Sequence, residues 1–176
     1  METVAGKRAG HGIGETLNGG ATASRLLSDA MRATLHTDGA ARHKTGEPTG
    51  PAGIRAVLRS ESGDIIGEIA SGIGLATNNV AEYTALIAGL QMALDARVTD
   101  IDVHFDSPVL AGHLLKGHTV KADHLRPLVE RVRQLLDLFS TSSLVRVPRA
   151  LNAHADKLAN QGIDHAIETP SAQLPN

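Results

Sequence analysis

The sequence predicts an α/β fold: a five-stranded mixed sheet, begun by three antiparallel strands and continued by alternating helices and strands, with helices on both faces. Apolar and polar residues alternate in the strand segments up to Ile69. From Asn78 onward the period changes to about 3.6 residues, which is typical of a helix. The 176 residues show no repeat, so they suit a single core of ordinary size.

The composition excludes several classes of site. Because cysteine is absent, the chain has no disulfides, zinc thiolates or thiol nucleophiles. Aromatic residues make up only 2%, which nearly excludes base-stacking platforms. The formal net charge is −2, so a nucleic acid must be met locally or through bound cations. No long apolar run or signal segment stands out, and we expect a cytoplasmic monomer with no membrane partner.

The organisation along the chain is simple. Residues 1–29 are rich in Gly, Ala, Ser and Thr and predict a flexible N-terminal extension. Residues 30–168 form the expected folded domain, and residues 169–176 a C-terminal tail that contains two prolines.

Three strands come first. Residues 31–38 alternate and stop at Gly39, and residues 40–51 contain the glycines and prolines of a loop. Residues 54–58 predict the second strand. Glu61–Asp64 supplies a hairpin turn, and residues 65–69 return as the third strand.

The first helix is predicted over residues 80–96, with Thr77, Asn78 or Asn79 as its cap. Glu82 is expected in its first turn, just off the buried stripe. From there its side chain could point along the sheet edge toward Asp38.

The remaining elements alternate. Residues 100–106 form a strand that ends in an acid, and residues 108–115 a short helix opened by Ser107-Pro108. A strongly amphipathic helix covers residues 125–139, and residues 144–147 form the fifth strand. A last helix is expected over residues 153–167, with Asn152 as its cap.

Four acids occupy ends of these elements: Asp38, Glu82, Asp106 and Asp156. Singly, Asp38 is typical of a turn, and Glu82 of an acid that favours a helix dipole. Together they are expected at one sheet edge, where ligands gather in open α/β sheets. Clustered carboxylates repel one another unless cations are bound, and hard divalent cations prefer such oxygen ligands. The pattern therefore predicts a metal site.

The motifs around these acids resemble those of a known family. They are Asp38-Gly39, Thr77–Glu82, Phe105–Ser107 and Asn152–Asn160, in that order. The chain is similar to type 1 ribonuclease H over residues 32–167, in the short form without a basic protrusion. The resemblance implies the ribonuclease H-like fold for the predicted domain.

The resemblance also implies an activity: an endonuclease that hydrolyses the RNA strand of RNA–DNA hybrids and leaves 5′-phosphate ends. Two Mg²⁺ or Mn²⁺ ions would be held by the catalytic carboxylates, which map to Asp38, Glu82, Asp106 and Asp156. Asn78 and Asn79 match positions that contact the minor groove of the hybrid. The other candidate substrate-binding residues are Ser107, Asn152, Arg146 and Arg149, with Lys116 and Lys121 as further phosphate contacts.

The chain departs from the family pattern in three places. Glu47-Pro48 stands where Asn-Pro is common, in a loop that is longer than in short members of the family. Only residues 117–123 separate the two middle helices. Arg146 and Arg149 occupy the approach where some members place a mobile catalytic histidine, and His154 lies nearby on the last helix.

Two alternatives stay open. A nuclease of the same architecture acting on another nucleic acid, such as branched DNA, is disfavoured by Asn78 and Asn79. A non-catalytic module that binds hybrids is disfavoured by the four acids, because a binder gains nothing from carboxylates that face phosphate without metal.

Overall fold

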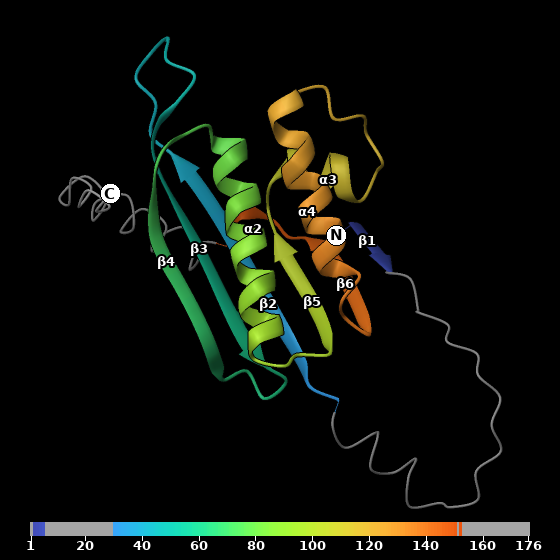
Figure 1. Ribbon diagram of the computed structural model, residues 1–176. Coiled ribbons are helices and arrows are strands. Elements are labelled where there is room, and N and C mark those ends of the chain that lie inside the picture. Colours follow the sequence, from blue (N-terminus) through green and yellow to red (C-terminus); the bar gives the residue numbers. More distant parts are fainter. Residues whose placement is uncertain (1, 6–29, 151, 153–176) are drawn as a thin grey trace, which may run out of the picture.

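The computed structural model describes residues 2–5, 30–150 and 152, and the structural statements below concern these residues. Their six strands form one sheet in the order β1-β6-β5-β2-β3-β4 (Figure 1). β2, β3 and β4 are an antiparallel meander, and β5 and β6 run parallel to β2. The strands are β1 Glu2–Ala5, β2 Arg32–Ala41, β3 Gly50–Ser60, β4 Ile65–Ala76, β5 Asp100–Phe105 and β6 Thr141–Arg146.

The described helices lie over one face of this sheet (Figure 1). They are α2 Asn78–Asp95, α3 Pro108–Leu114, a 3-10 turn η1 Asp123–Leu125, and α4 Arg126–Leu136. The mixed sheet and its alternating second half confirm the predicted fold class. The helix predicted over residues 153–167 lies outside the described residues, so helices on the second face remain a prediction, as do the domain boundaries.

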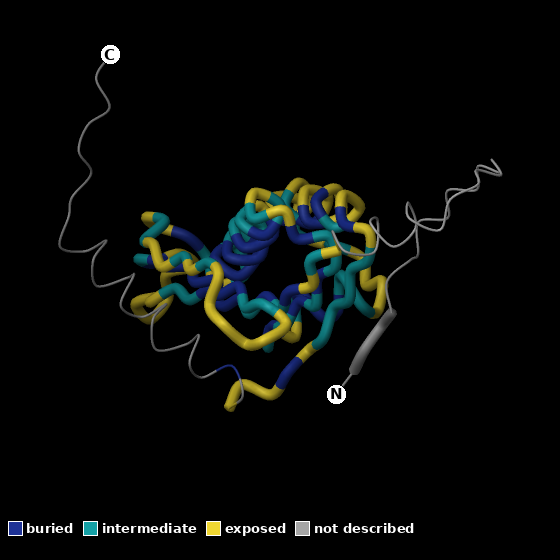
Figure 2. The backbone as a smooth tube through the Cα atoms, turned by 90° about the horizontal axis from the view of Figure 1, so that it is seen from below, coloured by how far each residue is buried: buried dark blue, intermediate teal, exposed yellow. Residues whose placement is uncertain are grey.

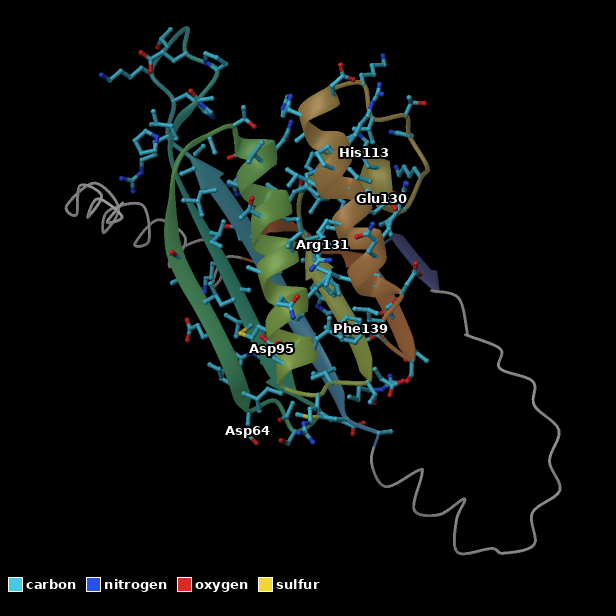
Figure 3. All side chains as sticks on the ribbon, viewed as in Figure 1. Asp64, Asp95, His113, Glu130, Arg131 and Phe139 are labelled. Atoms are coloured by element: carbon cyan, nitrogen blue, oxygen red, sulfur yellow. The ribbon has the colours of Figure 1, made fainter. Side chains whose placement is uncertain are left out.

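The core lies between α2, α4 and the sheet, where Figure 2 shows the buried parts of the tube facing one another. Leu35, Leu86, Val103 and Val132 are all fully buried there. Each such side chain contributes about 1.5–3 kcal/mol through burial. α4 is amphipathic: Glu130 and Arg131 are exposed (Figure 3), while Val132 packs inward.

The meander is longer than predicted. β3 starts at Gly50, inside the predicted loop, because the chain on either side pairs closely: the Arg42 N–H donates to the Pro51 carbonyl at 2.9 Å. A Cβ at Gly50 would lie 1.9 Å from the Arg42 carbonyl oxygen, so only glycine permits this approach. β4 continues to Ala76 because its glycine-rich end pairs with β3 through a bulge near Gly53.

A sixth strand, β1, was not predicted. Glu2–Ala5, placed by sequence in the flexible extension, pairs antiparallel with β6. The rest of that extension, residues 6–29, lies outside the described residues. β6 also begins earlier than predicted, at Thr141, because Thr141 and Ser143 donate side-chain hydrogen bonds to Asp100 and Asp102 of β5.

α2 begins two residues earlier than predicted, and this changes where Glu82 lies in the helix. The Thr77 hydroxyl accepts a hydrogen bond from the Val80 N–H at 3.1 Å and caps a helix that begins at Asn78. Glu82 therefore lies in the second turn, not the first. It is also only 6% exposed, so the expectation that it lies off the buried face was wrong.

Candidate active site

Asp38 and Asp106 reach the same edge of the sheet through their strands. Asp38 lies near the carboxyl end of β2, and Asp106 directly follows β5. The two strands are adjacent and parallel, so their carboxyl ends meet at one edge. Asp38 is buried, with 5% of its surface exposed, whereas Asp106 is partly exposed.

Gly39 brings α2 against the end of β2. A Cβ at this position would lie 2.2 Å from the main-chain carbon of Ala81 and 2.3 Å from the nitrogen of Glu82. No side chain fits between the strand and the helix there. The Gly39 N–H also donates a hydrogen bond to the Glu82 carboxylate. Gly39 thus fixes where Glu82 lies relative to Asp38.

These contacts bring three of the four predicted acids together. Asp38, Glu82 and Asp106 each offer one carboxylate oxygen, and these oxygens lie within 4.8 Å of one another. Burial first, and then the nearby charges of Asp38 and Asp106, raise the pKa of Glu82 to about 9. The Gly39 hydrogen bond and the positive charge of Arg149 act in the opposite direction.

The three acids fit a divalent metal ion. All the donors are carboxylate oxygens, the ligands that hard cations prefer. Oε2 of Glu82 is buried and has no hydrogen-bond partner within the described part of the chain, an arrangement that is costly without a ligand. A cation among the three oxygens would satisfy this atom and relieve the repulsion between the acids.

A cavity of about 680 Å³ opens over the acids. Five of the six predicted substrate-binding residues line it: Asn78, Asn79, Ser107, Arg146 and Arg149. Lys116 and Lys121 do not belong to its lining.

Three of the predicted substrate-binding residues also hold the local backbone in place. The Asn78 side-chain oxygen accepts a hydrogen bond from the Ala41 N–H at 3.2 Å, which ties α2 to β2. The Ser107 hydroxyl caps α3, accepting from the Leu110 N–H at 3.4 Å. Nε of Arg146 donates to the Asp106 carbonyl at 3.2 Å. These contacts fix the cavity wall before any ligand arrives.

Asn152 does not line the cavity. It is buried, and its amide donates to the Thr37 carbonyl at 3.1 Å, next to Asp38. Residues 149, 150 and 152 are helical, so the helix begins before Asn152 and the prediction that Asn152 caps it was wrong; its side chain contacts β2 instead. Asp156 and His154 lie outside the described residues, so the fourth acid stays a prediction.

Sequence reasoning missed Arg55. This residue is 1% exposed and lies opposite Asp38 in the β2–β3 pairing. The Glu61–Asp64 turn joins β3 to β4 and so gives no register against β2, and no local signal in the sequence pairs Arg55 with Asp38.

Comparisons with known proteins agree with this geometry. A family model described as reverse transcriptase-like matches residues 36–162. The ribonuclease HI of Halobacterium salinarum is 42% identical over 135 residues, which cover 77% of this chain and 66% of that relative. The structure of RNase H1 from the same organism is 41% identical, with a TM-score of 0.71, over 77% of this chain and 99% of that one. This chain belongs to the type 1 ribonuclease H family.

The chain spans different shares of the other ribonuclease H relatives. The N-terminal RNase H domain of a Mycobacterium tuberculosis protein is 35% identical, with a TM-score of 0.70, and 99% of it is covered. The bifunctional full-length protein from that organism is covered over only 38% of its length. The shared unit is therefore the ribonuclease H domain. Among the described residues, no helix is long and apolar enough to cross a membrane.

Proposed function

We propose that this protein is an endonuclease that hydrolyses the RNA strand of RNA–DNA hybrids with the help of divalent metal ions. The observation that carries the proposal is the meeting of Asp38, Glu82 and Asp106 at the floor of a cavity. A family member at 33% identity and a TM-score of 0.68, LC11-RNase H1, has a structure in complex with an RNA/DNA hybrid, which supports the substrate class.

The acidic residues of the site are the metal ligands in this proposal. Asp38, Glu82 and Asp106 hold Mg²⁺ or Mn²⁺, and Asp156 completes a site for two ions. When bound, such ions activate water and neutralise charge on the reacting phosphate. Because the chain is slightly acidic overall, this local positive charge is what lets the site accept a polyanion.

Substrate recognition rests on the cavity wall. Asn78 and Asn79 stand beside Glu82 at the start of α2 and line the cavity. Their amides can donate to and accept from the 2′-hydroxyls exposed in the wide minor groove of a hybrid. Arg146 and Arg149 also line the cavity and supply guanidinium groups for phosphate. Ser107 and Asn152 hold backbone around the site and act on substrate through it.

The test is a cleavage assay with labelled hybrid, double-stranded RNA and double-stranded DNA, each with Mg²⁺ or Mn²⁺. We expect cleavage of the hybrid alone, lost in Asp106→Asn. Cleavage of double-stranded DNA in preference to the hybrid supports the alternative nuclease. Hybrid binding without any cleavage supports the binding module and overturns the proposal. Light scattering of the same preparation checks the expected monomer, and a cytoplasmic location remains a prediction from sequence.

A further inference from the structure

A buried arginine lies beside the acid site. Arg55 of β3 pairs directly with Asp38 of β2, and side chains of paired residues project from the same face of a sheet, about 5 Å apart at Cβ. Only 1% of Arg55 is exposed. Burying a guanidinium is costly unless nearby negative charge compensates it, so the carboxylates around Arg55 need to be accounted for.

Two carboxylates face this guanidinium from opposite sides. β3 lies between β2, which carries Asp38, and β4, which carries Glu68. Nη2 of Arg55 donates to Oε1 of Glu68 at 3.1 Å. Burial lowers the pKa of Arg55, and the charges of Glu68 and Asp38 both act to raise it. The guanidinium is therefore shared between an ion pair at the sheet edge and the acid site.

We infer that Arg55 is a positioning residue for the acid site: its buried charge offsets the repulsion among Asp38, Glu82 and Asp106, and it thereby weakens divalent metal binding there. The three acids lie within 4.8 Å of one another, so a positive charge behind Asp38 stabilises them most when no cation is bound. A divalent cation must then bind against a charge of its own sign. The metal-binding half of this inference rests on the proposed function.

Glu68 moderates the effect. Its carboxylate is 40% exposed at the outer strand and draws the guanidinium toward β4. Without that carboxylate, the full charge of Arg55 acts on Asp38. The two residues therefore predict opposite changes: Arg55→Met tightens metal binding, and Glu68→Gln weakens it. Because Glu68 is at the surface, its variant is expected to fold even if Arg55→Met does not.

The first experiment measures the Arg55–Asp38 coupling without any metal or substrate. Melting temperatures are compared in EDTA for the wild type, Arg55→Met, Asp38→Asn and the double variant. Asp38→Asn removes one of the repelling charges, so it is expected to raise the melting temperature. The rise is expected to be roughly 3 °C larger in the Arg55→Met background than in the wild type. Equal shifts in the two backgrounds overturn the inference. If Arg55→Met does not fold, the same cycle is run with Glu68→Gln, where the rise is expected to be smaller than in the wild type.

The second experiment measures Mn²⁺ binding by calorimetry. We expect the Kd for Mn²⁺ to fall roughly threefold in Arg55→Met and to rise in Glu68→Gln. A threefold change is the effect expected from one partly screened charge. Arg59→Met is the matched control: Arg59 lies four residues farther along the same strand, opposite Thr34, and donates to the Gly63 carbonyl. A Kd in Arg55→Met equal to that of Arg59→Met overturns the metal half of the inference. A wild type that binds no Mn²⁺ and cleaves no hybrid overturns the proposed function, while the EDTA cycle still decides the charge coupling.

Discussion

Replacing Gly39 with alanine should damage the site without removing any of its chemical groups. The added Cβ would lie 2.2 Å from the Ala81 carbonyl carbon, 2.4 Å from its oxygen and 2.3 Å from the Glu82 nitrogen. All three are backbone atoms, which cannot rotate away. Ordinary contact starts near 3.4 Å, so β2 and α2 must separate by roughly 1 Å, beyond what a close-packed interior absorbs.

Two effects follow from this separation. Overpacking of a well-packed interior typically costs about 1–3 kcal/mol of unfolding free energy. Displacing Glu82 from Asp38 by roughly 1 Å should also lower kcat about 100-fold, because catalysis is this sensitive to misplacement. The expected variant is therefore folded, less stable, and nearly inactive on hybrid.

Urea unfolding and steady-state hydrolysis of a labelled hybrid measure the two effects. Gly67→Ala is the matched control, because the Cβ there would meet the side chain of Met92, whose sulfur at 2.8 Å can move aside. The control should lose little stability and keep its activity. If Gly39→Ala keeps wild-type stability and a kcat within about twofold of wild type, the close approach of β2 and α2 does not organise the site, and the reasoning is refuted.

Three further predictions address stability. The Asp100 carboxylate accepts hydrogen bonds from Thr141 and Thr99, which lower its pKa. These hydrogen bonds stabilise the folded protein fully at pH values above the unfolded pKa near 3.8, and this stabilisation is lost as the pH falls below it. Thr141→Val should therefore lower the free energy of unfolding by about 1 kcal/mol at pH 7 and by progressively less toward pH 3, as measured by urea titration. A loss that does not change with pH contradicts this prediction. Tyr83 is fully buried, and its hydroxyl lies 2.8 Å from Nδ1 of His113, a contact that joins α2 to α3. Tyr83→Phe should therefore lose about 1 kcal/mol of unfolding free energy by urea unfolding, and an unchanged midpoint argues against the link. Mn²⁺ should raise the melting temperature of the wild type by mass action and leave that of Asp106→Asn nearly unchanged in differential scanning fluorimetry; equal shifts would place the ion elsewhere.

The sequence was sufficient to single out three of the acids, because they stand where the hydrophobic period stops. Alternation up to Asp38 and from Asp100 to Asp106 marks two strand ends, and the change of period at Asn78 marks a helix. Parallel strand ends share an edge, so these patterns predict that Asp38, Glu82 and Asp106 meet, and the pairing of β2 with β5 brings them together.

What the sequence did not predict depends on tertiary pairing. Glu2–Ala5 has no period of its own and is a strand only because β6 pairs with it. The far end of β4 is glycine-rich and takes its conformation from β3. At the start of α2, Thr77, Asn78 and Asn79 are all favourable caps by residue type, and the hydrogen bond from the Val80 N–H shows that Thr77 is the cap.

Arg55 shows a second limit. A charged residue within a strand is ordinarily expected on a solvated face. Its burial depends on Glu68, which is thirteen residues away in sequence and reaches it only across the β3–β4 pairing. Charge compensation of this kind is a property of the assembled sheet, so composition and periodicity do not report it.

The central claim is that three carboxylates distant in sequence bind one divalent cation at a shared edge of the sheet. Anomalous diffraction from crystals grown with Mn²⁺ tests it most directly. The account predicts an anomalous peak bonded to carboxylate oxygens of Asp38, Glu82 and Asp106. A peak that contacts none of these three side chains, in crystals whose fold matches the structure described here, would contradict it.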